Sequence, residues 1–183
     1  MYILNGELVN PLLDSVNTFE NISTYRAASI ETKDIDGDGI LEIPVASDLL
    51  NAQEGGEKLY YTNWCSFDGQ NLSAKKVTVM NTVDGYYLTV PKTMIGYIAV
   101  DKNLESRVRK FYHYDSINNM LGKELFVITA VDINDWASSD YDRENKHELS
   151  RNDNTVFVAQ LSEGAESFLI TIDLIKDTFY LVE

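Results

Sequence analysis

The alternation of apolar and polar residues is the strongest structural signal along this chain. Side chains of a strand point alternately to the two faces of a sheet, so a period of two residues indicates a half-buried strand. Stretches of this kind, rich in β-branched and aromatic residues, predict strands over residues 72–80, 86–90, 96–101, 107–114, 124–131 and 155–160. Asp84-Gly85 separates the first two strands and is typical of a hairpin turn.

Two shorter stretches have a helical pattern instead. One covers residues 134–137, with Asn134 or Asp135 as its N-cap. The other covers residues 172–179, with Thr171 as its N-cap and one apolar face, and a short final strand or tail follows it. Hairpin-linked strands with late helices predict an α+β fold: a mainly antiparallel sheet, a short mid-chain helix and a C-terminal helix, preceded by a β-hairpin or blade-like segment.

The segment from Asp34 to Glu42 holds the clearest chemical pattern. It reads Asp-Ile-Asp-Gly-Asp-Gly-Ile-Leu-Glu, so acidic residues recur at alternate positions and two glycines permit a tight turn. Calcium is bound by oxygen ligands, and ligands with this spacing can converge on one ion. The sequence predicts a structural calcium site whose ligands are the side chains of Asp34, Asp36, Asp38 and Glu42 and the backbone carbonyl of Ile40.

This loop does not fit the helix–loop–helix type of calcium site. The twelfth position should be a bidentate Glu and is Val45, while Pro44 would obstruct an exiting helix and is tolerated at a strand edge. The sequence holds no second copy of the loop, which excludes a pair of helix–loop–helix calcium sites. A metal-free hairpin is the competing interpretation, because Asp and Gly also supply the positive φ angles of tight turns.

The loop and its flanking residues resemble the calcium loops of FG-GAP and VCBS-type β-propeller blades. Thr24-Tyr25-Arg26, the segment 34–44, Tyr60-Tyr61-Thr62-Asn63-Trp64 and Phe67-Asp68-Gly69 are similar to the last blade region of certain Firmicutes surface lipoproteins. The resemblance implies a β-rich, blade-like segment over residues 1–70, followed by a small α+β domain over residues 71–183. A single loop cannot close a propeller, so we expect an excised C-terminal fragment or a segment adopted as an appendage to the second domain.

Composition and charge narrow the class of protein. Of the 183 residues, 44% are hydrophobic, which is ample for a core, and 29 acidic against 15 basic residues give a net charge of −14. That charge argues against nucleic-acid binding. The single cysteine, Cys65, is expected to be a buried structural thiol. Neither a signal peptide nor an apolar run long enough to span a bilayer is visible, and the signal and upstream blades are expected to be missing from this chain.

Other candidate functional sites have weaker support in the sequence than the loop 34–42. His113 is expected on a strand surface and His147 in a polar loop, and their spacing does not fit metal binding. A second acidic cluster, residues 132–144, lacks the glycine turns of the first. Aromatic residues at 60–67 and 86–87 could stack on a sugar or peptide, although alternating aromatic residues more often form core. In the pairs Tyr60-Tyr61 and Tyr86-Tyr87, alternation places one member toward solvent.

Two functions remain open from the sequence. The first is a non-enzymatic extracellular or cell-surface lipoprotein module, stabilised by calcium, that binds or assembles with an unknown protein or carbohydrate. Calcium sites of the weak, extracellular kind favour that location. The second is a hydrolase that acts on carbohydrate or peptide through carboxylates dispersed along the chain, in a concave pocket.

Overall fold

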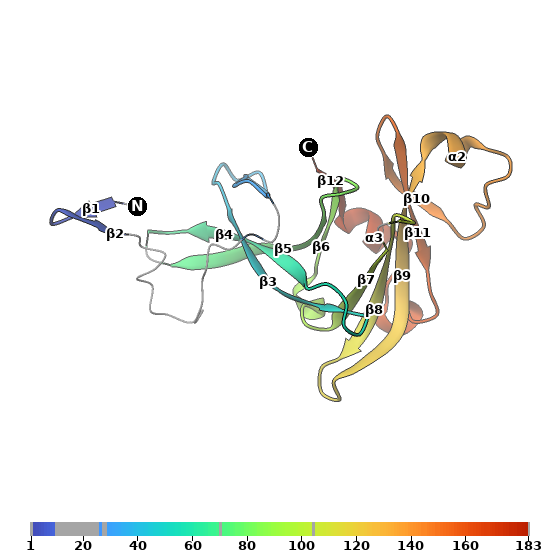
Figure 1. The fold of residues 1–183 in the computed structure, drawn as a ribbon, viewed down its shortest axis with the longest axis horizontal. Helices are drawn as coiled ribbons and strands as arrows, with labels where there is room; N and C mark the ends of the chain where they lie inside the picture. Colours follow the sequence, from blue (N-terminus) through green and yellow to red (C-terminus); the bar gives the residue numbers. More distant parts are fainter. Residues whose placement is uncertain (1, 10–25, 27–28, 70, 104, 183) are drawn as a thin grey trace. The chain divides into compact units, whose positions relative to one another are not determined.

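The computed structural model describes residues 2–9, 26, 29–69, 71–103 and 105–182. About half of them lie in strands and few in helices (Figure 1). The strands are β1 (Tyr2–Leu4), β2 (Glu7–Val9), β3 (Ile43–Asn51), β4 (Leu59–Phe67), β5 (Leu72–Asn81), β6 (Tyr86–Thr89), β7 (Ile98–Asn103), β8 (Val108–Asp115), β9 (Met120–Asp132), β10 (His147–Arg151), β11 (Thr155–Leu161) and β12 (Phe179–Leu181). The helical segments are α2 (Ile133–Ala137), α3 (Ile172–Thr178), and the 3-10 turns η1 (Lys92–Met94) and η2 (Glu166–Phe168).

The strand pairing is mainly antiparallel, as the sequence predicted. The six predicted stretches fall on β5, β6, β7, β8, β9 and β11. A parallel pairing joins the end of β3 to β7 through Leu50 and Asn51. The assignment to the α+β class stays a prediction, because the described helices are short and few.

The chain folds as two compact units. Unit 1 comprises Met1–Ser47 and Tyr61–Thr78, and unit 2 comprises Asp48–Tyr60 and Val79–Glu183. Neither unit is one continuous segment, because β3, β4 and β5 each contribute residues to both. The division into residues 1–70 and 71–183 stays a prediction.

Unit 1 is built on the antiparallel pair β4–β5. The indole of Trp64 on β4 is 2% exposed and donates from Nε1 to Oγ1 of Thr78 on β5, at 3.0 Å. The Asp-rich loop precedes β3 and is closed by an isolated antiparallel bridge between Lys33 and Glu42. Two backbone hydrogen bonds of 3.2 and 2.9 Å join these residues, so both ends of the loop are held together.

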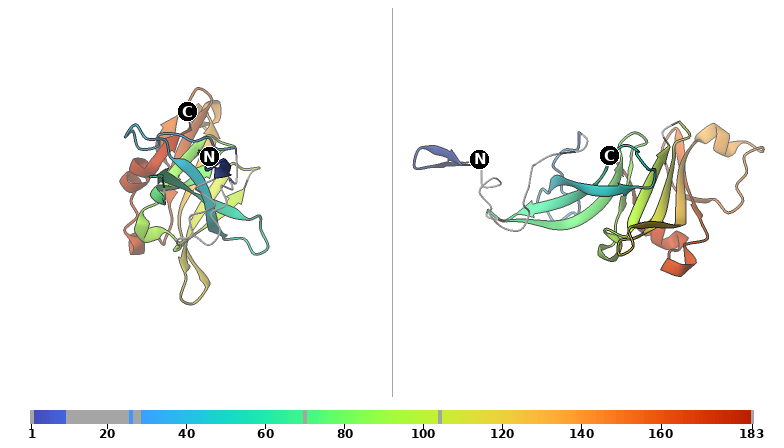
Figure 2. Two further views of the ribbon diagram at one scale, coloured as in Figure 1. Left: turned by 90° about the vertical axis from the view of Figure 1, so that its left-hand side faces the viewer. Right: turned by 60° about the horizontal axis from the view of Figure 1, so that its bottom comes forward.

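In unit 2, five strands pair antiparallel in the order β10-β11-β9-β8-β7, and β6 pairs antiparallel with β12. Figures 1 and 2 show β7, β8 and β9 side by side, with the β8–β9 turn projecting beyond its neighbours. Three rings form an aromatic centre: Tyr86 and Phe179 stack with centroids 5.0 Å apart, and Phe157 lies within 5.5 Å of both. Rings of this size contribute a large buried apolar area to the core.

The helices begin near the predicted residues, with one correction to a cap. Thr171 caps α3 as predicted, because its Oγ1 accepts a hydrogen bond from Leu174 N at 3.1 Å. The N-cap of α2 is Asp132, whose Oδ1 accepts from Asn134 N at 2.8 Å, so the prediction of Asn134 or Asp135 was wrong. A carboxylate placed before the first turn satisfies a backbone donor that the helix itself cannot.

Three further expectations differ from the structure. Phe179 does not continue the C-terminal helix but starts β12, where its ring packs into the aromatic centre. His147 was expected in a loop and lies at the start of β10. Tyr86 and Tyr87 are both buried, at 2% and 8% exposed, because the second ring stacks on Tyr180. Of the segment Thr24-Tyr25-Arg26, residues 24 and 25 lie outside the described part of the chain.

Candidate metal centre

The turn of the Asp-rich loop is organised around the carboxylate of Asp34. Its Oδ1 accepts hydrogen bonds from the backbone N–H groups of Gly37 and Asp38, at 2.6 and 3.2 Å, and its Oδ2 accepts from Gly39 N at 2.9 Å. Gly37 and Gly39 have φ angles of +80° and +85°, which side-chain-bearing residues rarely adopt. These N–H groups, that of Gly39 foremost, hold the pKa of Asp34 below its usual value. The carboxylate therefore stays charged under all but strongly acidic conditions.

Glu42, at the other end of the loop, is the most unusual side chain of the site. It is fully buried, with 0% of its surface exposed. Its Oε2 accepts a hydrogen bond from Ile35 N at 3.1 Å, whereas its Oε1 is buried and has no hydrogen-bond partner among the residues that the structure describes. A buried carboxylate with one oxygen unmatched is costly, because the water it lost on folding has not been replaced.

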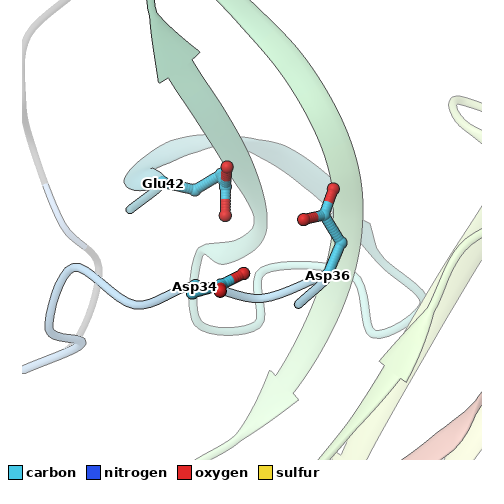
Figure 3. A group of neighbouring side chains, drawn as sticks. All are labelled: Asp34, Asp36 and Glu42. Atoms are coloured by element: carbon cyan, nitrogen blue, oxygen red, sulfur yellow. The ribbon is translucent and has the colours of Figure 1, made fainter. Parts of the chain in front are cut away.

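Three of the predicted ligands come together in the structure. Each of Asp34, Asp36 and Glu42 offers one carboxylate oxygen, and these oxygens all lie within 4.8 Å of one another. Figure 3 shows the three carboxylates directed toward a common space. Calcium–oxygen distances are about 2.3–2.6 Å, so oxygens on opposite sides of one ion are about 5 Å apart. All three can therefore reach a single metal ion of that size.

Asp38, a further predicted ligand, has a different place in the loop. The Oδ1 of Asp38 accepts a hydrogen bond from Ile40 N at 2.8 Å, so this carboxylate closes a turn on its own backbone. It does not belong to the group of converging oxygens formed by the other three acids. The roles of Asp38 and of the Ile40 carbonyl as ligands stay predictions.

An ammonium group also reaches the loop. Nζ of Lys76, on β5, donates to the backbone carbonyl of Ile35 at 2.6 Å. This contact spans 41 residues of sequence, and nothing in the sequence pattern around Lys76 predicted it. The positive charge offsets part of the repulsion among the acids, yet the buried Oε1 of Glu42 has no hydrogen bond with it.

The remaining candidates of the sequence do not form a comparable site. Among the residues that the structure describes, the group at 34, 36 and 42 is the one set of carboxylate, imidazole or thiol ligands that converges, so the second acidic cluster at 132–144 does not. Cys65 is buried, as predicted, and burial raises the pKa of its thiol to about 11. His147 is exposed, and the imidazole of His113 stacks on Phe168.

Comparison of the chain with protein-family models, curated proteins and solved structures gave no match. Within the described ranges, no helix has the length and apolar character needed to cross a membrane.

Proposed function

We propose that this chain is a non-enzymatic, extracytoplasmic module whose loop 34–42 holds a structural calcium ion, and that the module serves in binding or assembly. The proposal includes the interpretation that the loop is of the FG-GAP or VCBS type, attached to an α+β domain. The residues that would hold the ion are Asp34, Asp36 and Glu42, with Asp38 and the carbonyl of Ile40 as further oxygen donors.

The observation that carries the proposal is the unmatched oxygen of Glu42. A metal-free turn has no need of a fully buried carboxylate, since an exposed one forms the same hydrogen bond to Ile35 N without losing its hydration. A cation in the space shared with Asp34 and Asp36 would supply the missing partner of Oε1 and neutralise the three charges. The burial of Glu42 then follows from the presence of the ion.

The donor set favours calcium over other metals. Every ligand at the site is an oxygen, which suits hard cations, whereas zinc and copper prefer imidazole and thiolate. Magnesium demands near-ideal octahedral geometry and retains several waters, and a site built mainly from protein oxygens fits it less well. A weak site of the millimolar kind found in extracellular modules would be filled where calcium is abundant, which supports an extracellular or cell-surface location.

A structural role agrees with the position of the loop. The ion would join the two ends of a segment already closed by the Lys33–Glu42 bridge, immediately before β3 begins. An ion surrounded by protein oxygens stabilises a turn and leaves little room for a substrate. We therefore assign the calcium to stability and the binding role to another part of the chain.

Thermal unfolding in excess chelator, followed by a calcium titration, tests this proposal. Binding to the native state alone should raise the free energy of unfolding by about 2.7 kcal/mol at a hundredfold excess over the dissociation constant. For a chain of this size, that corresponds to a rise in Tm of about 5–10 °C. Asp36→Ala should abolish the rise because it removes one of the three converging oxygens.

Asp140→Ala is the matched control, since Asp140 is an exposed acid of the second cluster and should leave the calcium response intact. A wild-type protein with the same Tm in chelator and in calcium would identify the loop as a metal-free turn. An equal calcium response in Asp36→Ala would place the ion elsewhere in the chain.

A further inference from the structure

We infer that unit 2 carries a binding site for a neutral sugar ring, in a pocket beside β8. The pocket has a volume of about 330 Å³ and is lined by Thr93, Met94, Tyr97, His113, Leu125 and Phe168. This volume lies near the lower end of the range of about 300–1,000 Å³ that is usual for small-molecule sites. The inference names a ligand for the binding role proposed above and does not depend on the cation, whose loop belongs to unit 1.

The first wall of the pocket is held by η1 and the turn that follows it. Met94 N donates to the Pro91 carbonyl at 2.8 Å, and Tyr97 N donates to the Met94 carbonyl at 3.0 Å. The carbonyl of Tyr97 then accepts from Tyr114 N on β8, at 2.8 Å. The backbone of Tyr97 is thus fixed on both sides, while its side chain remains 49% exposed and available to a ligand.

The second wall is an aromatic pair made of His113 and Phe168. Their ring centroids lie 4.2 Å apart with an interplanar angle of 25°, which is a stacked arrangement. Gly122 on β9 makes room for this imidazole: a Cβ at that position would lie 2.8 Å from Nδ1 of His113 and 3.2 Å from its carbonyl oxygen. Glycine weakens the interior of a strand, and such a close approach is a physical reason for its presence there.

The segment that carries Phe168 is anchored to β9. Ser162 N donates to the Leu125 carbonyl at 2.9 Å, and Gly164 N donates to the Glu124 carbonyl at 3.0 Å. A Cβ on Gly164 would lie 2.6 Å from that Glu124 oxygen, so the close approach requires glycine. These contacts place the Phe168 ring, 43% exposed, at the edge of the pocket without covering it.

The segment then ends in an unusual backbone conformation. Leu169 caps η2 with φ +56° and ψ +32°, in the left-handed region, and its side chain is 83% exposed. A bulky residue rarely adopts this conformation, and backbone strain of this kind is often retained where a ligand is held. The anchored segment, with its close backbone approach at Gly164, indicates a pocket that is formed before any ligand arrives.

The chemistry of the lining selects the ligand. None of the six side chains is a carboxylate, an ammonium or a guanidinium, in a chain whose net charge is −14. A neutral ligand therefore fits best, because the lining offers no carboxylate to a cation and no ammonium or guanidinium to an anion. The exposed rings of Tyr97 and Phe168 offer flat apolar faces, and the hydroxyls of Thr93 and Tyr97 and the imidazole of His113 offer hydrogen bonds.

A pyranose ring has both complementary features. One of its faces is a patch of C–H groups that packs on aromatic rings, and its edge carries several hydroxyls that both donate and accept hydrogen bonds. A purely aromatic ligand such as indole would use the ring faces and leave most of the polar groups of the pocket unmatched.

Nuclear magnetic resonance titration of the whole chain tests the inference, because it detects weak binding and locates it. The probes are methyl β-glucopyranoside, methyl β-galactopyranoside, N-acetylglucosamine and indole, each added with calcium and again with excess chelator. At least one sugar should shift the resonances of His113, Tyr97 and Phe168 in a saturable way under both conditions. Binding that persists in chelator keeps this inference separate from the fate of the calcium proposal.

Two variants and a control make the outcome decisive. Phe168→Ala should weaken sugar binding by about tenfold, because it removes one of the two exposed ring faces on which the sugar would stack. Thr93→Val removes a hydroxyl from an exposed position with little change in volume and should also weaken binding. Tyr180→Leu removes another aromatic ring that is 43% exposed, outside the pocket, and should leave the affinity unchanged.

Three results would overturn the assignment. These are the absence of saturable shifts with all three sugars, saturable shifts with indole alone, and a sugar affinity that Phe168→Ala leaves unaltered while its spectrum shows an intact fold.

Discussion

Replacing Glu42 by glutamine separates the effect of the cation from the effect of an ordinary hydrogen bond. The substitution retains the size of the side chain and an oxygen that can accept from Ile35 N, and it removes the negative charge. Without calcium, the wild-type protein bears the cost of a buried oxygen with no partner, about 1–3 kcal/mol. Glu42→Gln lowers that cost, so in chelator the variant should be at least as stable as the wild type.

With calcium the order of stability should reverse. The wild type should gain about 2.7 kcal/mol at a hundredfold excess of calcium over the dissociation constant. The variant has lost one of three converging charged oxygens and should gain little. The two unfolding curves, recorded by circular dichroism in chelator and in calcium, should therefore cross, with Tm differences of about 2–4 °C for each kcal/mol.

Glu124→Gln is the matched control for this comparison. Unlike Glu42, Glu124 has its oxygens matched: Oε2 accepts from Tyr112 Oη at 3.2 Å, and Oε1 accepts from Ser162 Oγ at 2.6 Å. Its replacement should lower the stability by the same amount in chelator and in calcium. If Glu42→Gln behaves like this control, Glu42 serves only as a hydrogen-bond acceptor and the argument for the ion is refuted.

Three further predictions concern other features of the structure. The raised pKa of Cys65, about 11, should slow its alkylation by iodoacetamide at about pH 8 by about 100-fold relative to the unfolded chain, since only the thiolate reacts. Asp84→Ala should lower the free energy of unfolding by about 2 kcal/mol, measured in urea, because Asp84 is nearly buried and pairs with Arg107 Nε at 2.6 Å. Thr171→Ala should cost about 1 kcal/mol through loss of the hydrogen bond to Leu174 N.

Each of these predictions has a direct check. A native alkylation rate within about tenfold of the unfolded rate would show that the thiol of Cys65 is neither buried nor shifted in pKa. Asp84→Asn keeps a neutral acceptor for Arg107 and should lose less stability than Asp84→Ala; a negligible loss in Asp84→Ala would contradict a role for the ion pair. Thr171→Asn retains a capping oxygen, so a loss as large as that of the alanine variant would argue against the cap.

The sequence alone determined the local structure of this protein. Alternation over residues 107–114 predicted β8, and Asp84-Gly85 predicted the turn before β6, because both signals arise between residues close together in the chain. Thr171 was found as an N-cap for the same reason. The acidic and glycine residues of the loop 34–42 indicated oxygen ligands and a tight turn, which needs only the backbone preferences of a few neighbours.

Burial and long-range contacts were decided by the tertiary structure. Nothing in the local pattern indicates that Glu42 is buried more completely than Asp34 or Asp36, since that depends on what packs over the start of β3. Lys76 reaches the loop from a strand 41 residues away. Alternation along β8 puts Arg109 on the same face as Phe111. The exposed fraction of this arginine is only 9%, and that low value depends on the elements that pack over this face.

The proposed sugar pocket shows most clearly which features depend on the tertiary structure. Its lining residues lie on η1, the turn after it, β8, β9 and η2, and they span residues 93 to 168 of the chain. The sequence placed His113 on a strand surface, whereas Phe168 and Gly122 gave no signal of their own. A binding pocket arises where elements distant in sequence meet, so its chemistry becomes visible only after strand order and register have brought those side chains together.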